Sequence, residues 1–86
     1  MTAPVIMYGT LACPFCRSAR DLLDGRGVAY EEIRVDREPE RRTEMRARGG
    51  GHTVPQIWIG ETHVGGFTDL LALDRQGRLD SLLNPE

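Results

Sequence analysis

The sequence predicts an α/β fold in which a mixed four-stranded sheet carries three to four helices on its faces. Two patterns support this prediction. An apolar extended segment, a helical segment and a second extended segment follow one another near the start, and two short extended segments later flank a Gly-Glu turn. The first pattern is typical of a parallel strand-helix-strand unit and the second of an antiparallel hairpin. At 86 residues the chain has room for one domain, over residues 1–86.

The first strand and the first helix have clear signals. Residues 5–8 form a continuous apolar run, which suits a central strand buried on both faces, and Gly9-Thr10 ends it. From Pro14 onward apolar residues recur at helical spacing, at Phe15, Ala19, Leu22 and Leu23. Gly25 and Gly27 are stop signals, so we expect a helix of about three turns.

A second strand and a second helix are expected next. Residues 30–35 read as a strand. Pro39 can open a helix that continues through Met45. Charged residues four positions apart, Glu38 with Arg42 and Glu44 with Arg48, are expected to pair on the surface of this helix.

Glycines separate the remaining elements. Three consecutive glycines at 49–51 end the second helix, and residues 56–59 and 62–64 flank Gly60-Glu61 as a hairpin. Thr68 is expected to be the N-cap of a third helix that carries several leucines. Asp80 is expected to begin a short terminal turn that ends at Leu83.

Composition and charge exclude several classes of function. The formal net charge of −2 argues against nucleic-acid binding, which usually needs a clearly basic domain. The longest apolar run, residues 3–8, is far too short to cross a bilayer core of about 30 Å. The N-terminus lacks a basic region followed by an apolar one, so no secretory signal is recognised and a cytoplasmic location is expected. We also expect a monomer.

The motif Cys13-Pro14-Phe15-Cys16 between the first strand and the first helix predicts thiol-disulfide chemistry. If Pro14 is the first helical residue, Cys13 is the N-cap, and its sulfur lies where the free N–H groups of the first turn converge. These donors and the helix dipole favour a thiolate at Cys13, whereas Cys16 lies one turn further in and more buried. We therefore expect Cys13 to attack and Cys16 to resolve.

The two cysteines are also compatible with two other uses. Both could be ordinary small apolar residues. A zinc site would have to recruit His52 and His63, whose separation does not match the usual H-x₃₋₅-H spacing, so no metal site is expected. A structural disulfide is also disfavoured, because a loop of two intervening residues constrains the unfolded chain very little.

Three motifs in this order resemble the dithiol class of the glutaredoxin family, in particular its bacterial glutaredoxin 3 type: Cys13-Pro14-Phe15-Cys16, Thr53-Val54-Pro55, and Gly65-Gly66 followed by Thr68-Asp69. The resemblance covers nearly the whole chain. It implies a thioredoxin-like fold with strand order 2-1-3-4 and a cis peptide bond before Pro55. It also implies glutathione as co-substrate, with no bound cofactor.

The resemblance assigns a glutathione site along these motifs. The Val54 backbone, flanked by Thr53 and Pro55, would pair with the cysteine of glutathione in strand fashion. Gly66, Phe67, Thr68 and Asp69 would hold its γ-glutamyl end at a helix N-terminus, with Phe15 beside the reacting sulfur. Asp69 could pair with the ammonium group of the ligand.

One departure from the family concerns the carboxylate of the glycine residue of glutathione. Thr10 stands where relatives commonly carry a lysine or arginine. Arg42, which matches a second basic position, could supply the remaining partner for this carboxylate. An equally simple interpretation places Arg42 on the solvated face of an Arg-rich helix.

The function predicted from the sequence is therefore that of a glutathione-dependent oxidoreductase. Its substrates would be disulfide-bonded or glutathionylated proteins, with ribonucleotide reductase as one candidate. Two alternatives remain open at this point. The first is a redoxin of the same fold that is reduced by thioredoxin reductase, and the second is a carrier in which Cys13 and glutathione bridge a [2Fe–2S] cluster.

Overall fold

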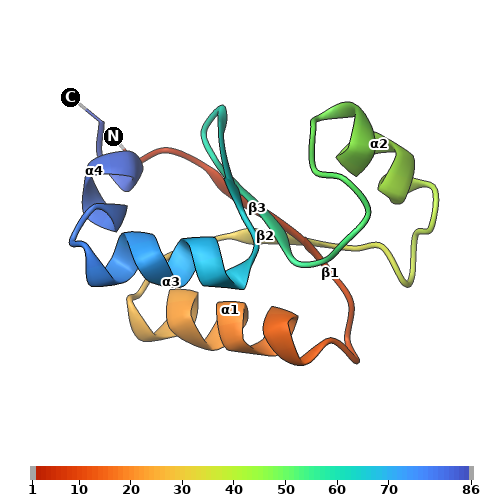
Figure 1. The fold of residues 1–86 in the computed structure, drawn as a ribbon, viewed down its shortest axis with the longest axis horizontal. Coiled ribbons are helices and arrows are strands. Elements are labelled where there is room, and N and C mark those ends of the chain that lie inside the picture. Colours follow the sequence, from red (N-terminus) through yellow and green to blue (C-terminus); the bar gives the residue numbers. More distant parts are fainter. Residues whose placement is uncertain (1, 86) are drawn as a thin grey trace.

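The computed structural model describes residues 2–85 as a sheet with helices on both faces (Figure 1). Two parallel helices, α1 and α3, cover one face together with the terminal helix α4, and α2 covers the other. In chain order the elements are β1 (Val5–Gly9), α1 (Pro14–Gly25), β2 (Glu31–Arg34), α2 (Arg41–Ala47), β3 (Gln56–Ile59), β4 (Thr62–Gly65), α3 (Phe67–Arg75) and α4 (Leu79–Leu83).

The strand order is β2-β1-β3-β4, which confirms the predicted mixed sheet. β1 is parallel to β2, with Tyr8 opposite Ile33, and antiparallel to β3, with Met7 opposite Ile57. β3 and β4 form the expected antiparallel hairpin. The Cys13-Cys16 motif therefore follows the C-terminal end of a central strand after a short loop, residues 10–12.

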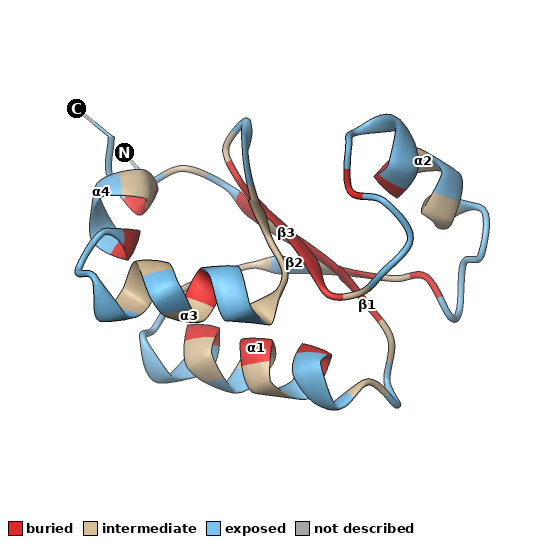
Figure 2. Ribbon diagram, in the orientation of Figure 1, coloured by how far each residue is buried: buried red, intermediate tan, exposed pale blue. Residues whose placement is uncertain are grey.

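Each central strand contributes side chains to two different clusters, because successive residues of a strand point to opposite faces. In β3, Ile57 and Ile59 pack toward α1 and α3, whereas Trp58 packs toward α2. Figure 2 shows that the buried residues are concentrated along β1 and β3. The cluster under α1 and α3 is entirely apolar and comprises Val5, Met7, Ala19, Leu23, Ile57, Ile59, Leu70, Leu79 and Leu83. The cluster under α2 comprises Tyr8, Ile33, Val35, Met45 and Trp58.

The bounds of α2 differ from the prediction. The helix begins at Arg41 rather than at Pro39, because the N–H groups of Arg41 and Arg42 bond to the carbonyl groups of Glu38 and Pro39 in a preceding turn. It ends at Ala47, two residues beyond Met45. Smaller differences concern β2, which covers 31–34 instead of 30–35, and α4, which begins at Leu79 instead of Asp80.

The predicted ion pairs on α2 are wrong. Within residues 2–85, Arg41 is the cation that pairs with both neighbouring carboxylates, Glu38 at 3.5 Å and Glu44 at 3.0 Å. Arg48 instead lies over the Trp58 ring, 4.7 Å from its centroid, and donates to the Tyr8 hydroxyl at 3.1 Å. Arg48 therefore gains contacts with an aromatic ring, which an ion pair between two exposed residues of the helix would not provide.

None of the described helices is long and apolar enough to cross a membrane.

Candidate active site

Cys13 lies at the N-terminus of α1, as the sequence predicted. Its backbone is extended (φ −80°, ψ 117°), and Pro14 is the first helical residue. The Cys16 N–H donates to the Cys13 Sγ at 3.2 Å, so the sulfur occupies the place of an ordinary capping oxygen. The first turn of α1 contains no acidic residue that would offset the positive end of the helix dipole.

Cys16 has the opposite environment. Its side chain has an exposed fraction of 0%, whereas Cys13 is half-buried, and both are free thiols. Burial, followed by the contact with Cys13, raises the pKa of Cys16 to about 12. Cys16 is therefore a neutral thiol at rest, and Cys13 is the sulfur that a second molecule can reach.

The segment before β3 approaches Cys13 from the other side. The Cys13 thiol donates to the Val54 carbonyl, with 3.6 Å between sulfur and oxygen. The Val54-Pro55 peptide bond is cis, as the family resemblance implied. Val54 is thus placed next to the attacking sulfur, although it lies 41 positions later in the chain.

One cleft of about 310 Å³ joins the three sequence motifs. It lies between the N-terminus of α1, the segment before β3 and the N-terminus of α3. Its size is at the lower end for small-molecule sites. The structure brings together eight of the predicted substrate-binding residues around this cleft: Phe15, Thr53, Val54, Pro55, Gly66, Phe67, Thr68 and Asp69.

The N-terminus of α3 is capped differently from the prediction. Gly66 is the N-cap and Thr68 is the second helical residue, exposed to solvent. The Gly66 N–H donates to the Asp69 Oδ2 at 3.0 Å, so the carboxylate of the first turn closes the helix end. Gly65 has a φ of +112°, and a Cβ on it would collide with the Asp69 carboxylate. A glycine is therefore required directly before this cap.

Arg42 does not line the cleft. It is half-buried on α2, and its Nη1 donates to the His52 carbonyl at 3.3 Å. This bond ties α2 to the residue that precedes Thr53. In the structure Arg42 therefore holds the backbone of the segment that leads into Thr53, Val54 and Pro55.

Sequence reasoning missed a polar relay that reaches the cleft from the hairpin. His63 on β4 lies 2.7 Å from the Oε1 of Gln56, and the Gln56 Nε2 donates to the Thr53 Oγ1 at 3.1 Å. The His63 ring also stacks on Trp58, with 4.4 Å between centroids. The relay orients the hydroxyl of a cleft residue, and no local spacing in the sequence signals it.

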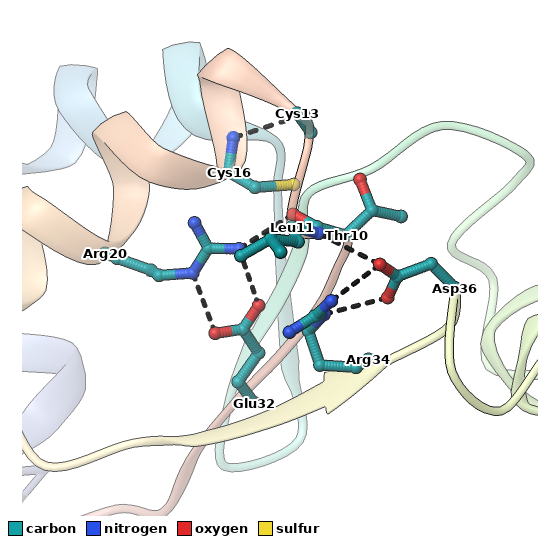
Figure 3. A network of polar contacts seen from close by, with 8 residues as sticks. All are labelled: Thr10, Leu11, Cys13, Cys16, Arg20, Glu32, Arg34 and Asp36. Atoms are coloured by element: carbon teal, nitrogen blue, oxygen red, sulfur yellow. Dashed lines mark hydrogen bonds and ion pairs between the residues drawn. The ribbon is translucent and has the colours of Figure 1, made fainter.

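A network of two ion pairs holds the loop before Cys13, and the sequence did not predict it either (Figure 3). Arg20 pairs with Glu32 and donates to the Thr10 carbonyl at 2.7 Å. On the other side of the loop, Asp36 pairs with Arg34 and accepts from the Leu11 N–H at 3.2 Å. The carbonyl and the N–H of the Thr10-Leu11 peptide group are therefore both held by charged side chains.

The surface around Cys13 is apolar. Leu11 and Phe15 are the two large apolar side chains that are strongly exposed among the described residues, with exposed fractions of 70% and 60%. They lie two residues on either side of the attacking cysteine. A substrate that presents a disulfide to Cys13 would therefore meet apolar side chains.

Comparisons with known proteins agree with this geometry. The family model described as glutaredoxin matches residues 5–64. A glutaredoxin of Pseudomonas aeruginosa is 54% identical over 81 residues, which cover 94% of this chain and 96% of the relative. Glutaredoxin 3 of Escherichia coli is 46% identical over 81 residues, covering 94% and 98%. The crystal structure of a buckwheat glutaredoxin-glutathione complex superposes with a TM-score of 0.81 at 26% identity, covering 94% of this chain and 76% of the other.

Proposed function

The chain belongs to the glutaredoxin family of thiol-disulfide oxidoreductases with the thioredoxin-like fold, and on this premise we propose that it uses glutathione to reduce protein disulfides and glutathione mixed disulfides. The observation that carries the proposal is the cleft. At its edge the half-buried, helix-capping Cys13 donates to the Val54 carbonyl, and Val54 and the N-terminus of a second helix both line the cleft.

On the route with one thiol, the Cys13 thiolate attacks the glutathione sulfur of a glutathionylated protein. The protein leaves as a thiolate and takes up a proton, and Cys13 carries the glutathione. A second glutathione thiolate then attacks this mixed disulfide, which releases oxidised glutathione and frees Cys13. The helix end stabilises the negative sulfur at Cys13 before the attack and again when it leaves.

On the route with two thiols, Cys13 first forms a mixed disulfide with a cysteine of the substrate protein. Cys16 then attacks Cys13 and releases the substrate, so that Cys13 and Cys16 form a disulfide. Glutathione reopens it in two steps. The hydrogen bond between the Cys16 N–H and the Cys13 Sγ shows that both residues already lie in the same turn of helix.

The proposed glutathione site follows the cleft. The backbone of Val54 would pair with the cysteine residue of the ligand, and the N–H groups of the first turn of α3 suit the γ-glutamyl carboxylate. The Asp69 carboxylate, which is exposed, suits the ammonium group. The relative from buckwheat was solved as a complex with glutathione, which supports this choice of ligand.

Arg42 would contribute to this site through the bond that it donates to the His52 carbonyl. With Thr10 in place of a basic residue, the carboxylate of the glycine residue of the ligand has fewer cationic partners nearby. We expect this to appear as weaker affinity for glutathione and not as loss of reaction.

The proposed setting is the cytosol, because a catalytic pair of cysteines that glutathione returns to the thiol form suits a reducing compartment. Disulfide-bonded and glutathionylated proteins are the proposed partners there, with ribonucleotide reductase as a candidate. The protein is proposed to act as a monomer that binds neither nucleic acid nor membrane.

The test is NADPH oxidation with a glutathione mixed disulfide as substrate. One arm contains glutathione with glutathione reductase, and the other contains thioredoxin reductase alone. We expect turnover in the first arm. Turnover confined to the second arm would overturn the proposal and assign the chain to redoxins that take electrons from thioredoxin reductase.

A further inference from the structure

Arg20 on α1 makes three hydrogen bonds beside the active-site loop. Its Nε and Nη2 donate to the two carboxylate oxygens of Glu32, at 2.8 and 2.9 Å, in a fork-to-fork arrangement. The same Nη2 donates to the Thr10 carbonyl at 2.7 Å. Both charged side chains are mostly buried, with exposed fractions of 19% and 18%. Figure 3 shows this pair below the Cys13-Cys16 turn.

The buried Cys16 thiol lies next to this ion pair. A Cβ placed on Gly9 would lie 3.2 Å from the Cys16 Sγ and 3.1 Å from the Glu32 Oε2, so both groups approach the same glycine. Burial raises the pKa of Cys16, and the Thr10 backbone and the charge of Arg20 act against that rise. Arg20 therefore acts on Cys16 in two ways, through Thr10, whose carbonyl it binds, and through its charge.

We propose that Arg20 is a positioning residue for the resolving step, in which it fixes Thr10 beside Cys16 through the carbonyl of Thr10 and supplies the nearby positive charge while the buried sulfur attacks. Both carboxylate oxygens of Glu32 accept hydrogen bonds from the Arg20 guanidinium and so hold it in place. This inference rests on the proposed reaction with two thiols. It assigns no role to Arg20 in the attack by Cys13.

The resolving step creates the need for such a residue. The Cys16 thiol releases its proton and its sulfur attacks the Cys13 sulfur, which breaks the bond between Cys13 and the substrate sulfur. The substrate leaves as a thiolate and takes up one proton, so it is reduced while the two cysteines are oxidised to a disulfide. During this step a negative charge develops on a sulfur that is shielded from water, where an adjacent cation has its largest effect.

Cys13 is held by different groups. Its sulfur bonds to the Cys16 N–H and the Val54 carbonyl, neither of which is attached to Arg20. Loss of Arg20 should therefore slow resolution and leave the reaction of Cys13 with glutathione mixed disulfides almost unchanged. A role of Arg20 in stability alone would slow both reactions or neither.

The experiment measures closure of the Cys13-Cys16 disulfide directly. Cys13 is loaded with glutathione by a short pulse of a thiolating reagent, and closure is followed after acid quench by mass spectrometry as loss of one glutathione. We expect Arg20→Gln to slow closure about tenfold and to move its pH profile to higher pH. In a Cys16→Ser background the same substitution should change turnover of a glutathione mixed disulfide by less than about twofold.

Arg17→Gln is the matched control. Arg17 lies on the same helix, carries the same charge, is exposed, and has no ion-pair partner among the salt bridges of residues 2–85. We expect closure within about twofold of the wild type in this variant. Arg20→Lys keeps the positive charge but lacks the planar guanidinium that bonds to both oxygens of Glu32. Its closure rate should therefore lie between those of Arg20→Gln and the wild type.

The double variant Arg20→Gln/Glu32→Gln protects the test against misfolding. It removes both charges and leaves no half-buried carboxylate unpaired, and slow closure is expected here too. Closure at the wild-type rate in the folded Arg20 variants would overturn the inference, as would equal slowing by Arg17→Gln. Failure of the wild type itself to close would overturn the proposed reaction with two thiols, and this inference with it.

Discussion

Two helix N-termini face the same cleft, and they differ in the group that caps them. α1 and α3 lie side by side and run in the same direction, so their N-termini point the same way (Figure 1). At α1 the cap is the sulfur of Cys13, which accepts from the Cys16 N–H. At α3 the cap is the carboxylate of Asp69, which accepts from the Gly66 N–H.

The difference separates reaction from recognition. The first turn of α1 carries no acidic residue, so the positive end of its dipole acts on the sulfur alone. The first turn of α3 carries Asp69, whose carboxylate offsets the dipole and remains exposed to a ligand. The α1 end therefore suits a sulfur that gains and loses negative charge, and the α3 end suits a ligand that presents both a carboxylate and an ammonium group.

The largest expected effect comes from removing the sulfur at the α1 end. Cys13→Ser should lower turnover of protein disulfides and of glutathione mixed disulfides by more than about 1,000-fold, because a serine hydroxyl is not ionised near neutral pH and a group that reacts covalently has no substitute. The measurement is the NADPH-coupled assay with each substrate. Near-wild-type turnover of Cys13→Ser would show that the reaction does not begin at this helix end.

The second effect separates the two sulfurs of α1. Cys16→Ser should abolish the route that resolves a protein mixed disulfide and spare deglutathionylation, since Cys16 is buried and keeps its proton at rest. Both activities are measured on the same preparation with the two substrates. Equal loss of the two activities would mean that Cys16 also supports the attack by Cys13.

The main features of this site could be predicted from the sequence because they are local. The motif from Cys13 to Cys16 contains its own cap, and the apolar runs of β1 and β3 require burial whatever their partners are. The ion pair between Arg20 and Glu32 in Figure 3 could not be predicted, because the two residues come from different elements and meet only when β2 pairs with β1.

The cap of α3 was predicted at the wrong residue for a physical reason. Thr68 and Asp69 both have side chains that can cap a helix, and the sequence does not show which backbone N–H each can reach. The structure starts the helix two residues earlier than a Thr68 cap would allow, so only Asp69 is positioned to accept from Gly66. The contact of Arg42 could not be predicted either, since its partner is the backbone carbonyl of His52, and a backbone group gives no signal in the sequence.

The next prediction tests recognition at the α3 end. Asp69→Asn keeps a capping group and removes the charge, so we expect KM for a glutathione mixed disulfide to rise about fivefold, the size of one exposed charge pair of about 1 kcal/mol. The expected change in kcat is small, because the reacting sulfur is unaffected. A fall in kcat with unchanged KM would contradict the assignment of this end to recognition.

A smaller effect tests which residue caps α3. Asp69→Ala should lower the free energy of unfolding by about 1 kcal/mol through loss of the bond from the Gly66 N–H. Thr68→Ala, the matched control one residue away, should change it by less than about 0.5 kcal/mol, since Thr68 is exposed and lies inside the helix. Urea denaturation of both variants provides the comparison, and the reverse order of the two effects would restore Thr68 as the cap.

The last effect is absent near neutral pH and concerns the stability of the reduced protein at alkaline pH. In the folded state burial raises the pKa of Cys16 from 9.0 to about 12, whereas the unfolded chain releases this proton near pH 9. Between these pH values the unfolded state binds fewer protons, so the free energy of unfolding should fall as pH rises, by at most about 1.4 kcal/mol per pH unit.

Burial also raises the pKa of Tyr8 and of Tyr30, so these two tyrosines lower the free energy of unfolding at alkaline pH as well. Because both tyrosines remain in Cys16→Ser, the difference between wild type and variant isolates the thiol. Urea denaturation under reducing conditions from pH 8 to 10 should therefore show a steeper decline for the wild type. Parallel curves would mean that Cys16 ionises as easily in the folded protein as in the unfolded chain, and the contrast between the half-buried Cys13 sulfur and the buried Cys16 sulfur would then be one of access alone.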